Sequence, residues 1–291
     1  MACGASSRSS RWHGATGCWR DGPRNAAVKD DALPWLRRAQ PLLGTLVEIG
    51  LRGGGLGAGA GAARHATFDA AFDAAFGAAF SAIREVQACL SRFEPDSDIA
   101  RFNALRAGGS LSIRPTTRHV LQAARELQQA SAGAFDVSLG SAPDGWRCEG
   151  DRLHKLAAAA RLDLGGIGKG HAVDCAVDAL IAHAGAAGWV NAGGDLRAFG
   201  AAELPIRLRD ERAGGTRPFA SLCDGAFATS HYGRHSRSHL ARRAGERTAP
   251  AHVSVAAPLC LWADALTKVV AISGDTAHPL LARFDAQAWL H

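Results

Sequence analysis

The stretch RLDLGGIGKGHAVD, residues 161–174, says more about the fold than any other part of the chain. Its apolar start predicts a short strand, and the four glycines that follow predict a tight turn with positive φ angles. The run over residues 172–184 favours a helix. The start of a helix presents N–H donors and a partial positive charge. The strand, turn and helix together therefore predict a binding site for an anion, usually a phosphate.

Two known phosphate-binding motifs do not fit this turn. A P-loop has Gly five residues before its Gly-Lys pair and Ser or Thr directly after it. Here the pair is Gly168-Lys169, and those two positions hold Asp163 and Gly170. A dinucleotide fingerprint needs G-x-G-x-x-G, whereas Gly166, Gly168 and Gly170 are spaced by two. On glycine content alone, a turn without a ligand explains the pattern equally well.

The composition is that of an ordinary globular protein. The chain has 291 residues, 47% of them hydrophobic and 21% charged, and a net charge of +6. Much of the positive charge lies in the first forty residues, where a solvated basic tail explains it better than nucleic-acid binding does, and a single Tyr leaves few rings to stack on bases. Seven scattered cysteines without C-x-x-C, no secretory signal and no run of about 18 apolar residues predict a cytoplasmic protein without a membrane span.

Hydrophobic spacing predicts the main elements. Residues 1–35 are expected to be a disordered basic extension, and residues 36–291 a folded domain. Within the domain, the pattern predicts a strand over 43–51, a long helix over 66–90 with a core stripe of phenylalanines, and a helix over 117–129. Further elements follow in the order strands 188–191, 206–208, 225–229 and 252–256, helix 263–273, one more helix and a last short strand. Strands and helices without strict alternation predict the α+β class.

Seven motifs in order resemble the ApbE family, flavin transferases that use FAD to attach FMN to a protein Ser or Thr. They are LGT (43–45), LSRFEPDSDI (90–99), GAFD (133–136), LDLGGIGKG (162–170), NAGGD (191–195), ATS (228–230) and ADAL (263–266). The resemblance spans about residues 36–290. It implies a mixed sheet packed with helices, a flavin site between two subdomains, FAD as substrate and an acceptor flavoprotein, with AMP released.

The resemblance also implies the residues of the site. It implies a bound Mg²⁺ held by the Gly168 carbonyl and by Asp264, which would be the catalytic residue, neutralising charge on the leaving AMP. An acceptor hydroxyl would then attack the FMN phosphorus in line. The residues expected to contact the flavin nucleotide are Leu43, Gly44, Ala134, Phe135, Asp136, Gly165, Gly168, Lys169, His171, Thr229 and His239. Without the resemblance, Asp264 would be taken as a carboxylate that favours a helix start.

One departure from the family pattern concerns the metal. Four residues after Asp264 the family usually has Thr, but this chain has Lys268, with Thr267 one residue earlier. Positions i and i+4 share a helix face, so the Lys268 ammonium is expected to reach the Asp264 carboxylate and to compete with Mg²⁺. The plainer alternative is a solvated surface lysine. Thr267 is rotated about 100° away and is expected to be a poor ligand.

Other departures leave alternatives open. Arg242 stands where the family has Asp, and His171 stands where an aromatic residue is common. Two other functions therefore stay open, an FAD-binding protein without transferase activity in which Lys268 replaces the metal, and a Mg²⁺-dependent FAD pyrophosphatase. His231, His235 and His239 have a four-residue spacing that suits a zinc site, but their segment does not look like a helix.

Overall fold

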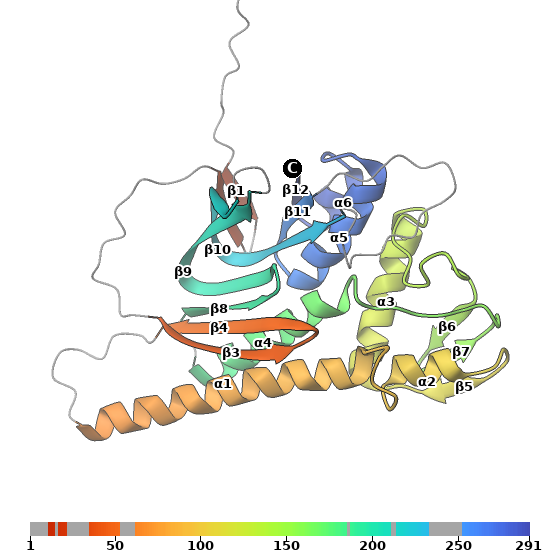
Figure 1. The fold of residues 1–291 in the computed structure, drawn as a ribbon, viewed down its shortest axis with the longest axis horizontal. Coiled ribbons are helices and arrows are strands. Elements are labelled where there is room, and N and C mark those ends of the chain that lie inside the picture. Colours follow the sequence, from red (N-terminus) through yellow and green to blue (C-terminus); the bar gives the residue numbers. More distant parts are fainter. Residues whose placement is uncertain are drawn as a thin grey trace, which may run out of the picture.

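A nine-stranded sheet and the helices beside it form the larger lobe of the molecule (Figure 1). The computed structural model describes residues 11–14, 17–21, 35–52, 62–184, 187–210, 214–232 and 252–291. The strands of the large sheet are β1 (Arg11–Gly14), β2 (Gly17–Asp21), β3 (Leu36–Leu42), β4 (Thr45–Arg52), β8 (Ala187–Ala192), β9 (Asp195–Arg209), β10 (Thr216–His231), β11 (His252–Ala257) and β12 (Gln287–Leu290). Their order is β1-β2-β10-β9-β8-β4-β3, with β11 between β10 and β12, and every described ladder is antiparallel.

Helices cover this sheet and connect it to a smaller lobe. The helices beside the sheet are α1 (Ala62–Leu90), α4 (Gly168–Ala184), α5 (Cys260–Ser273) and α6 (Pro279–Arg283). The smaller lobe contains α2 (Asp98–Ala104), β5 (Ser110–Ser112), α3 (Pro115–Ala130), β6 (Trp146–Glu149) and β7 (Arg152–Lys155). Figure 1 shows α1 running below the sheet as far as this lobe, and α4 and α5 pack against each other. The predicted α+β class is confirmed.

The expected core stripe on the long helix is confirmed. Phe72, Phe76 and Phe80 are each no more than 4% exposed and pack with strand β4 in one hydrophobic core. The side chain of Phe68 lies outside the described residues. Helix α3 begins two residues earlier than expected because Pro115 fits the first turn, where a helix needs no amide donor.

The glycine turn differs from the sequence prediction. Residues 161–164 do not form a strand, and α4 begins at Gly168, four residues before the expected start. The glycines of this turn do not have positive φ. Close packing explains them instead, most clearly at Gly170, where a Cβ atom would lie 2.2 Å from the Cys260 carbonyl oxygen. The fit is also tight at Gly166 and Gly168, where a Cβ atom would lie 3.0 Å from Cε of Lys268 and 3.3 Å from Cδ1 of Leu90.

Two further expectations need correction at the N-terminal side. The strand expected over 43–51 begins at Thr45, because Leu43 and Gly44 form the turn between β3 and β4 with φ angles of 56° and 71°. Residues 11–14 and 17–21, expected to be disordered, form a hairpin whose second strand pairs with β10. The strands expected over 206–208 and 225–229 are parts of the longer β9 and β10.

No helix in the described ranges is both long and apolar enough to cross a membrane.

Candidate active site

Four charged side chains meet where α4, α5 and β9 come together. Lys169 lies in the first turn of α4, Asp195 is the first residue of β9, and Asp264 and Lys268 lie one turn apart on α5. Asp264 and Asp195 are 0% and 1% exposed, and Lys268 is 9% exposed. The Lys169 side chain retains 33% exposure, so it is the member of this cluster that solvent reaches most.

The chain brings α5 to this point through contacts from α4. Gly170 has no side chain, so the start of α5 packs directly on the α4 backbone, and the Gly170 amide donates to Oδ2 of Asp264 at 3.2 Å. One turn later, the Asp174 carboxylate accepts from the amides of Cys260 and Leu261 at 2.9 and 2.8 Å. Asp174 thus supplies the N-terminal cap that α5 lacks within its own sequence.

Both carboxylate oxygens of Asp264 are occupied within the protein. Oδ1 accepts from the Lys268 ammonium, and Oδ2 accepts from the Gly170 amide with the Lys169 ammonium 3.8 Å away. The Lys268 ammonium also donates to the Asp264 backbone carbonyl at 2.9 Å and to Oγ of Ser230 at 3.2 Å. Lys169 in turn pairs with Asp195. The cluster is a closed network of two ammonium and two carboxylate groups.

The electrostatics of the cluster keep Asp264 and Lys169 charged. Burial opposes ionisation of Asp264, but the Lys169 and Lys268 ammonium groups outweigh it and lower the pKa of its carboxyl. Burial likewise opposes the charge on Lys169, yet Asp195 and Asp264 raise the pKa of its ammonium. Burial and the negative charge of Asp264 raise the pKa of Asp195 to about 6. Asp195 is therefore the member of the cluster that takes up a proton first as the pH falls below neutrality.

The donor set around Asp264 does not fit a divalent cation while Lys268 is in place. Mg²⁺ requires oxygen ligands in near-octahedral geometry. The oxygens available here, the Asp264 carboxylate and carbonyl and Oγ of Ser230, already surround the Lys268 ammonium. A dication about 4 Å from that ammonium would be repelled by about 8 kcal/mol at an effective dielectric constant of about 20.

The structure decides between the two interpretations of Lys268. The expected contact between Lys268 and the Asp264 carboxylate is confirmed, and the alternative of a solvated surface lysine is wrong because only 11% of its side chain is exposed. The Thr267 hydroxyl lies 2.8 Å from Oγ of Ser230 and donates to the Asp264 carbonyl at 2.7 Å. Thr267 therefore stabilises the groups around Lys268, because its hydroxyl donates to a carbonyl of its own helix and bonds to Ser230.

The GAFD segment lies beside the glycine turn, because the amide of Asp163 donates to the Val137 carbonyl at 2.8 Å. Phe135, which follows Ala134, is buried, and its amide donates to Oγ of Ser131. The Asp136 carboxylate accepts from the amide and hydroxyl of Ser138 and from the amide of Gly140, at 2.8 to 2.9 Å. Asp136 thus shapes its own loop, and its contact with a flavin stays a prediction.

The other expected contact residues lie on several elements. Leu43 and Gly44 occupy the β3–β4 turn, where the Leu43 amide donates to Oε1 of Gln87 at 2.7 Å. Gly165 lies in the glycine turn, and its amide donates to Oδ1 of Asp163. Thr229 on β10 bonds to the Gly194 carbonyl and to Oγ of Ser254, close to Asp195, whose strand partner is Ala228.

His171 on α4 faces the smaller lobe rather than the charged cluster. Its ring lies 5.0 Å from that of His119 on α3, centroid to centroid, and its Nε2 lies 3.4 Å from the sulfur of Cys175. Burial and the His119 ring lower the pKa of His171 to about 4. His171 is therefore neutral at neutral pH and connects α4 to α3.

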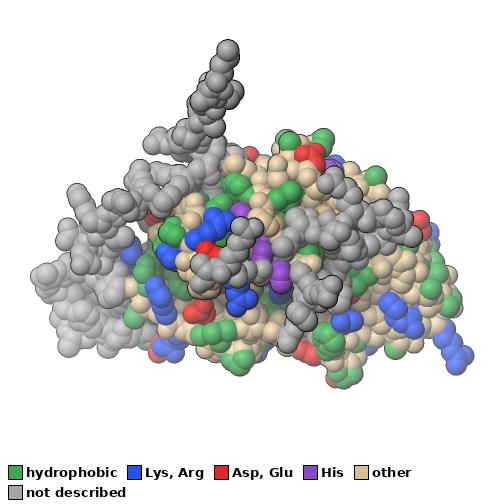
Figure 2. Space-filling model, turned by 45° about the horizontal axis from the view of Figure 1, so that its top comes forward, with side chains coloured by type: hydrophobic (Ala, Val, Ile, Leu, Met, Phe, Trp, Pro, Cys, Tyr) green, Lys and Arg blue, Asp and Glu red, His purple; other side chains and the backbone are tan. Residues whose placement is uncertain are grey.

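The histidines considered for zinc are only partly described. His231 and His252 stack on paired strands with ring centroids 4.5 Å apart. His235, His239 and Arg242 lie outside the described residues. Figure 2 shows histidine side chains close to Lys and Arg side chains near the middle of one face. Within the ranges that the structure describes, no group of three or more His, Cys, Asp or Glu suits a metal ion.

Asp195, Ser230 and Asp174 complete the site and were not expected as site residues. Asp195 and Ser230 end two of the motifs that carry the family resemblance, NAGGD and ATS, so the motifs gave a signal for them. Asp174 has no comparable motif. Its role depends on the contact between α4 and the start of α5, more than eighty residues further along the chain.

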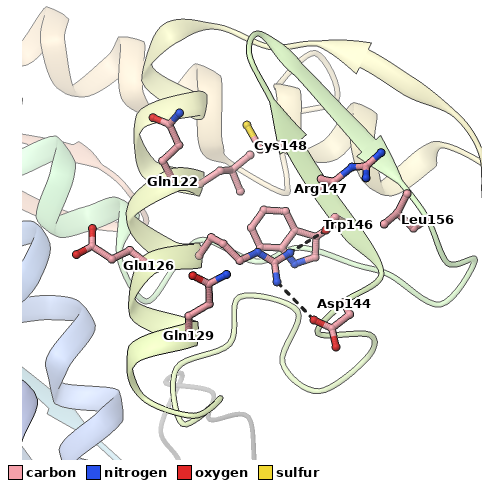
Figure 3. Close-up of a pocket in the computed structure, with 10 residues that line it drawn as sticks. Gln122, Glu126, Gln129, Asp144, Trp146, Arg147, Cys148 and Leu156 are labelled. Carbon is pink, nitrogen blue, oxygen red and sulfur yellow. Dashed lines mark hydrogen bonds and ion pairs between the residues drawn. The ribbon is translucent and has the colours of Figure 1, made fainter.

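A pocket of about 550 Å³ between α3 and the β6–β7 hairpin is a separate feature (Figure 3). Arg125 is one of the residues that line it, and its guanidinium lies 3.9 Å from the ring centroid of Trp146. Arg125 donates to the carbonyls of Pro143 and Trp146 and pairs with Asp144. The Arg125 guanidinium therefore holds parts of the smaller lobe together, and the pocket shares no residue with the charged cluster.

Comparison with known proteins gives a consistent result. The model of the ApbE family matches residues 43–159 and 148–290. The apo form of the Pseudomonas stutzeri flavinyl transferase ApbE is 24% identical with a TM-score of 0.65, over 88% of this chain and 89% of that one. The ApbE protein of Thermotoga maritima is 19% identical with a TM-score of 0.70, over 88% and 94%. The Vibrio cholerae flavin transferase ApbE is 19% identical with a TM-score of 0.64, over the same shares. No curated protein matches.

Proposed function

The chain belongs to the ApbE family, and from this we propose that it is a flavin transferase that takes FAD and attaches FMN to a Ser or Thr of an acceptor flavoprotein. The acceptor oxygen would form a bond to the FMN phosphorus. The bond from that phosphorus to the bridging oxygen would break, and AMP would leave with that oxygen and take up the hydroxyl proton. The reaction thus breaks the phosphoanhydride bond of FAD and forms a phosphoester bond to the acceptor.

The observation that carries this proposal is the meeting of the glycine turn and the late helix. The Gly170 amide donates to Asp264 at 3.2 Å, and Lys169, whose side chain is 33% exposed, lies beside it at the start of α4. A helix start and an ammonium group together favour a pyrophosphate. In the proposal, the Lys169 ammonium at the start of α4 binds the phosphates of FAD, and Asp264 fixes the ammonium groups around them.

The remaining expected contacts belong to the same proposal. Leu43, Gly44 and Thr229 lie at strand ends of the large sheet, and Phe135 lies next to the glycine turn in the loop before β6. We propose that the isoalloxazine and adenine rings lie along these segments, between the large sheet and the smaller lobe. Contact with the flavin nucleotide stays a prediction for six further residues, Ala134, Asp136, Gly165, Gly168, His171 and His239. The cytoplasmic location also stays a prediction.

Product analysis tests the proposal. The purified chain is incubated with FAD and a pool of synthetic peptides containing Ser and Thr, and AMP and peptide masses are measured. AMP together with peptides heavier by FMN less one water is the expected result. AMP with free FMN would instead identify a pyrophosphatase, and FAD binding without AMP would identify a binding protein, the alternative that the buried Lys268 favours. Asp264→Asn is the control variant and should release no AMP.

A further inference from the structure

We propose that the Lys268 ammonium replaces a divalent cation at Asp264, so that this chain binds FAD without a metal. The part of this inference that concerns FAD rests on the proposed function. The part that concerns the cation rests on the contacts of Lys268 alone. In this proposal, Lys268 alone determines whether the chain needs a metal to bind FAD.

The Lys268 ammonium uses every donor it has on oxygens of the kind that Mg²⁺ prefers. An ammonium group has three N–H donors. Those of Lys268 are directed at a carboxylate oxygen and the backbone carbonyl of Asp264 and at the Ser230 hydroxyl. Carboxylate, carbonyl and hydroxyl oxygens are also the ligands of hard divalent cations. The ammonium therefore lies where such a cation would find its protein ligands.

The residues around Lys268 accommodate its side chain closely. A Cβ on Gly166 would lie 3.0 Å from Cε of Lys268, so glycine at this position makes room for the lysine stem. The Thr267 hydroxyl lies 2.8 Å from Oγ of Ser230, which keeps that oxygen next to the ammonium. Lys268 is 9% exposed, and solvent therefore does little to draw it away from Asp264.

The charges of the cluster are already balanced without a metal. Lys169 and Lys268 carry two positive charges, and Asp195 and Asp264 carry two negative charges. A divalent cation would add two positive charges to a cluster that is already neutral, and both oxygens of Asp264 already accept hydrogen bonds. Adding a metal therefore requires the ammonium of Lys268 to leave.

Direct metal binding tests the cation part of the proposal without FAD. Binding of Mn²⁺ is measured by electron paramagnetic resonance for the wild-type chain, for Lys268→Thr and for Lys155→Met. Lys155 is the matched control, because it is a buried lysine that contacts the Asn103 carbonyl and not the cluster. We expect one Mn²⁺ bound by Lys268→Thr and none by the wild type or by Lys155→Met. Mn²⁺ bound by the wild type would overturn the proposal, and so would a folded Lys268→Thr that binds none.

FAD affinity in EDTA and in millimolar Mg²⁺ tests the second part. The wild-type dissociation constant should change by less than about twofold between the two conditions, whereas that of Lys268→Thr should fall at least about tenfold on adding Mg²⁺. A wild type that loses about tenfold or more in EDTA would overturn the proposal even if the variant failed to fold. If no form binds FAD at all, the proposed function fails, and the Mn²⁺ measurement still decides the role of Lys268.

Discussion

Gly170 on α4 lies so close to Cys260 at the start of α5 that a Cβ atom on it would be 2.2 Å from the Cys260 carbonyl oxygen. This contact sets the distance between the two helices that carry Lys169 and Asp264. Because the atom in the way belongs to the backbone, a side chain at position 170 cannot be accommodated by a rotamer change. Helix α5 can therefore approach α4 this closely only because residue 170 has no side chain.

Gly170→Ala should lower the free energy of unfolding by about 3 kcal/mol, since the helix pair must move apart. Gly77→Ala is the matched control, because Gly77 lies in helix α1 and a Cβ atom there would meet nothing within 4 Å. That variant should raise the free energy of unfolding by up to about 1 kcal/mol, the usual gain for Gly→Ala in a helix. Urea denaturation of the two variants measures both values. Equal effects would show that the contact at Gly170 is not a constraint.

Asp174→Asn should lower the free energy of unfolding by about 2 to 3 kcal/mol. The carboxylate accepts from two α5 amides and from Arg197 at 3.0 Å, whereas an Asn side chain has one acceptor oxygen and turns an NH₂ group toward a donor. Asp178→Asn is the control, since Asp178 also contacts Arg197 but is 71% exposed. Its effect should stay within about 0.5 kcal/mol. Comparable losses in both variants, measured by urea denaturation, would contradict the capping role of Asp174.

The parts of the fold that depend on local periodicity could be predicted from the sequence. The stripe of Phe72, Phe76 and Phe80 gave the long helix and its buried face, because helical spacing and burial are properties of neighbouring residues. The i,i+4 relation likewise predicted the contact between Lys268 and Asp264. Each of these predictions needed only one element.

The parts that depend on two distant elements could not be predicted. Glycines with positive φ and glycines that allow close packing look alike in a sequence, and the partner of Gly170 lies ninety residues away. The burial of the Lys268 side chain depends on the position of Ser230, which β10 brings next to α5. No local sequence pattern predicts this contact. The role of Asp136 in its own loop is local, but it was obscured because a carboxylate in a site motif is also expected to bind a ligand.

The pair of Lys169 and Asp195 should show strong coupling in a double-mutant cycle. Lys169→Met leaves the Asp195 carboxylate buried without its ammonium partner and should lower the free energy of unfolding by about 3 to 5 kcal/mol. Lys169→Met combined with Asp195→Asn should cost less than the sum of the single variants by at least about 1 kcal/mol. The exposed pair Arg283–Glu126 is the control, with a coupling energy below about 1 kcal/mol. Additive effects of Lys169→Met and Asp195→Asn in urea denaturation would contradict the closed network.

His171 should make the stability of the chain depend on pH. Its pKa is lowered to about 4 in the folded state by burial and by His119, and an unfolded histidine titrates near 6.5. Between these values the unfolded chain binds more protons than the folded chain, so the free energy of unfolding falls as the pH falls. The contribution of His171 at pH 5 is a loss of about 2 kcal/mol relative to pH 8.

His171→Phe keeps an aromatic ring beside His119 and removes the titrating group, so the loss between pH 8 and pH 5 should shrink by about 2 kcal/mol. His183→Gln is the control, because His183 is exposed on the same helix and bonds only to the carbonyl one turn before it among the contacts described. Urea denaturation at the two pH values gives the difference for each variant. A pH dependence that His171→Phe leaves as steep as in the wild type would mean that the ring of His171 protonates freely in the folded protein, and that its packing against α3 does not hold it neutral.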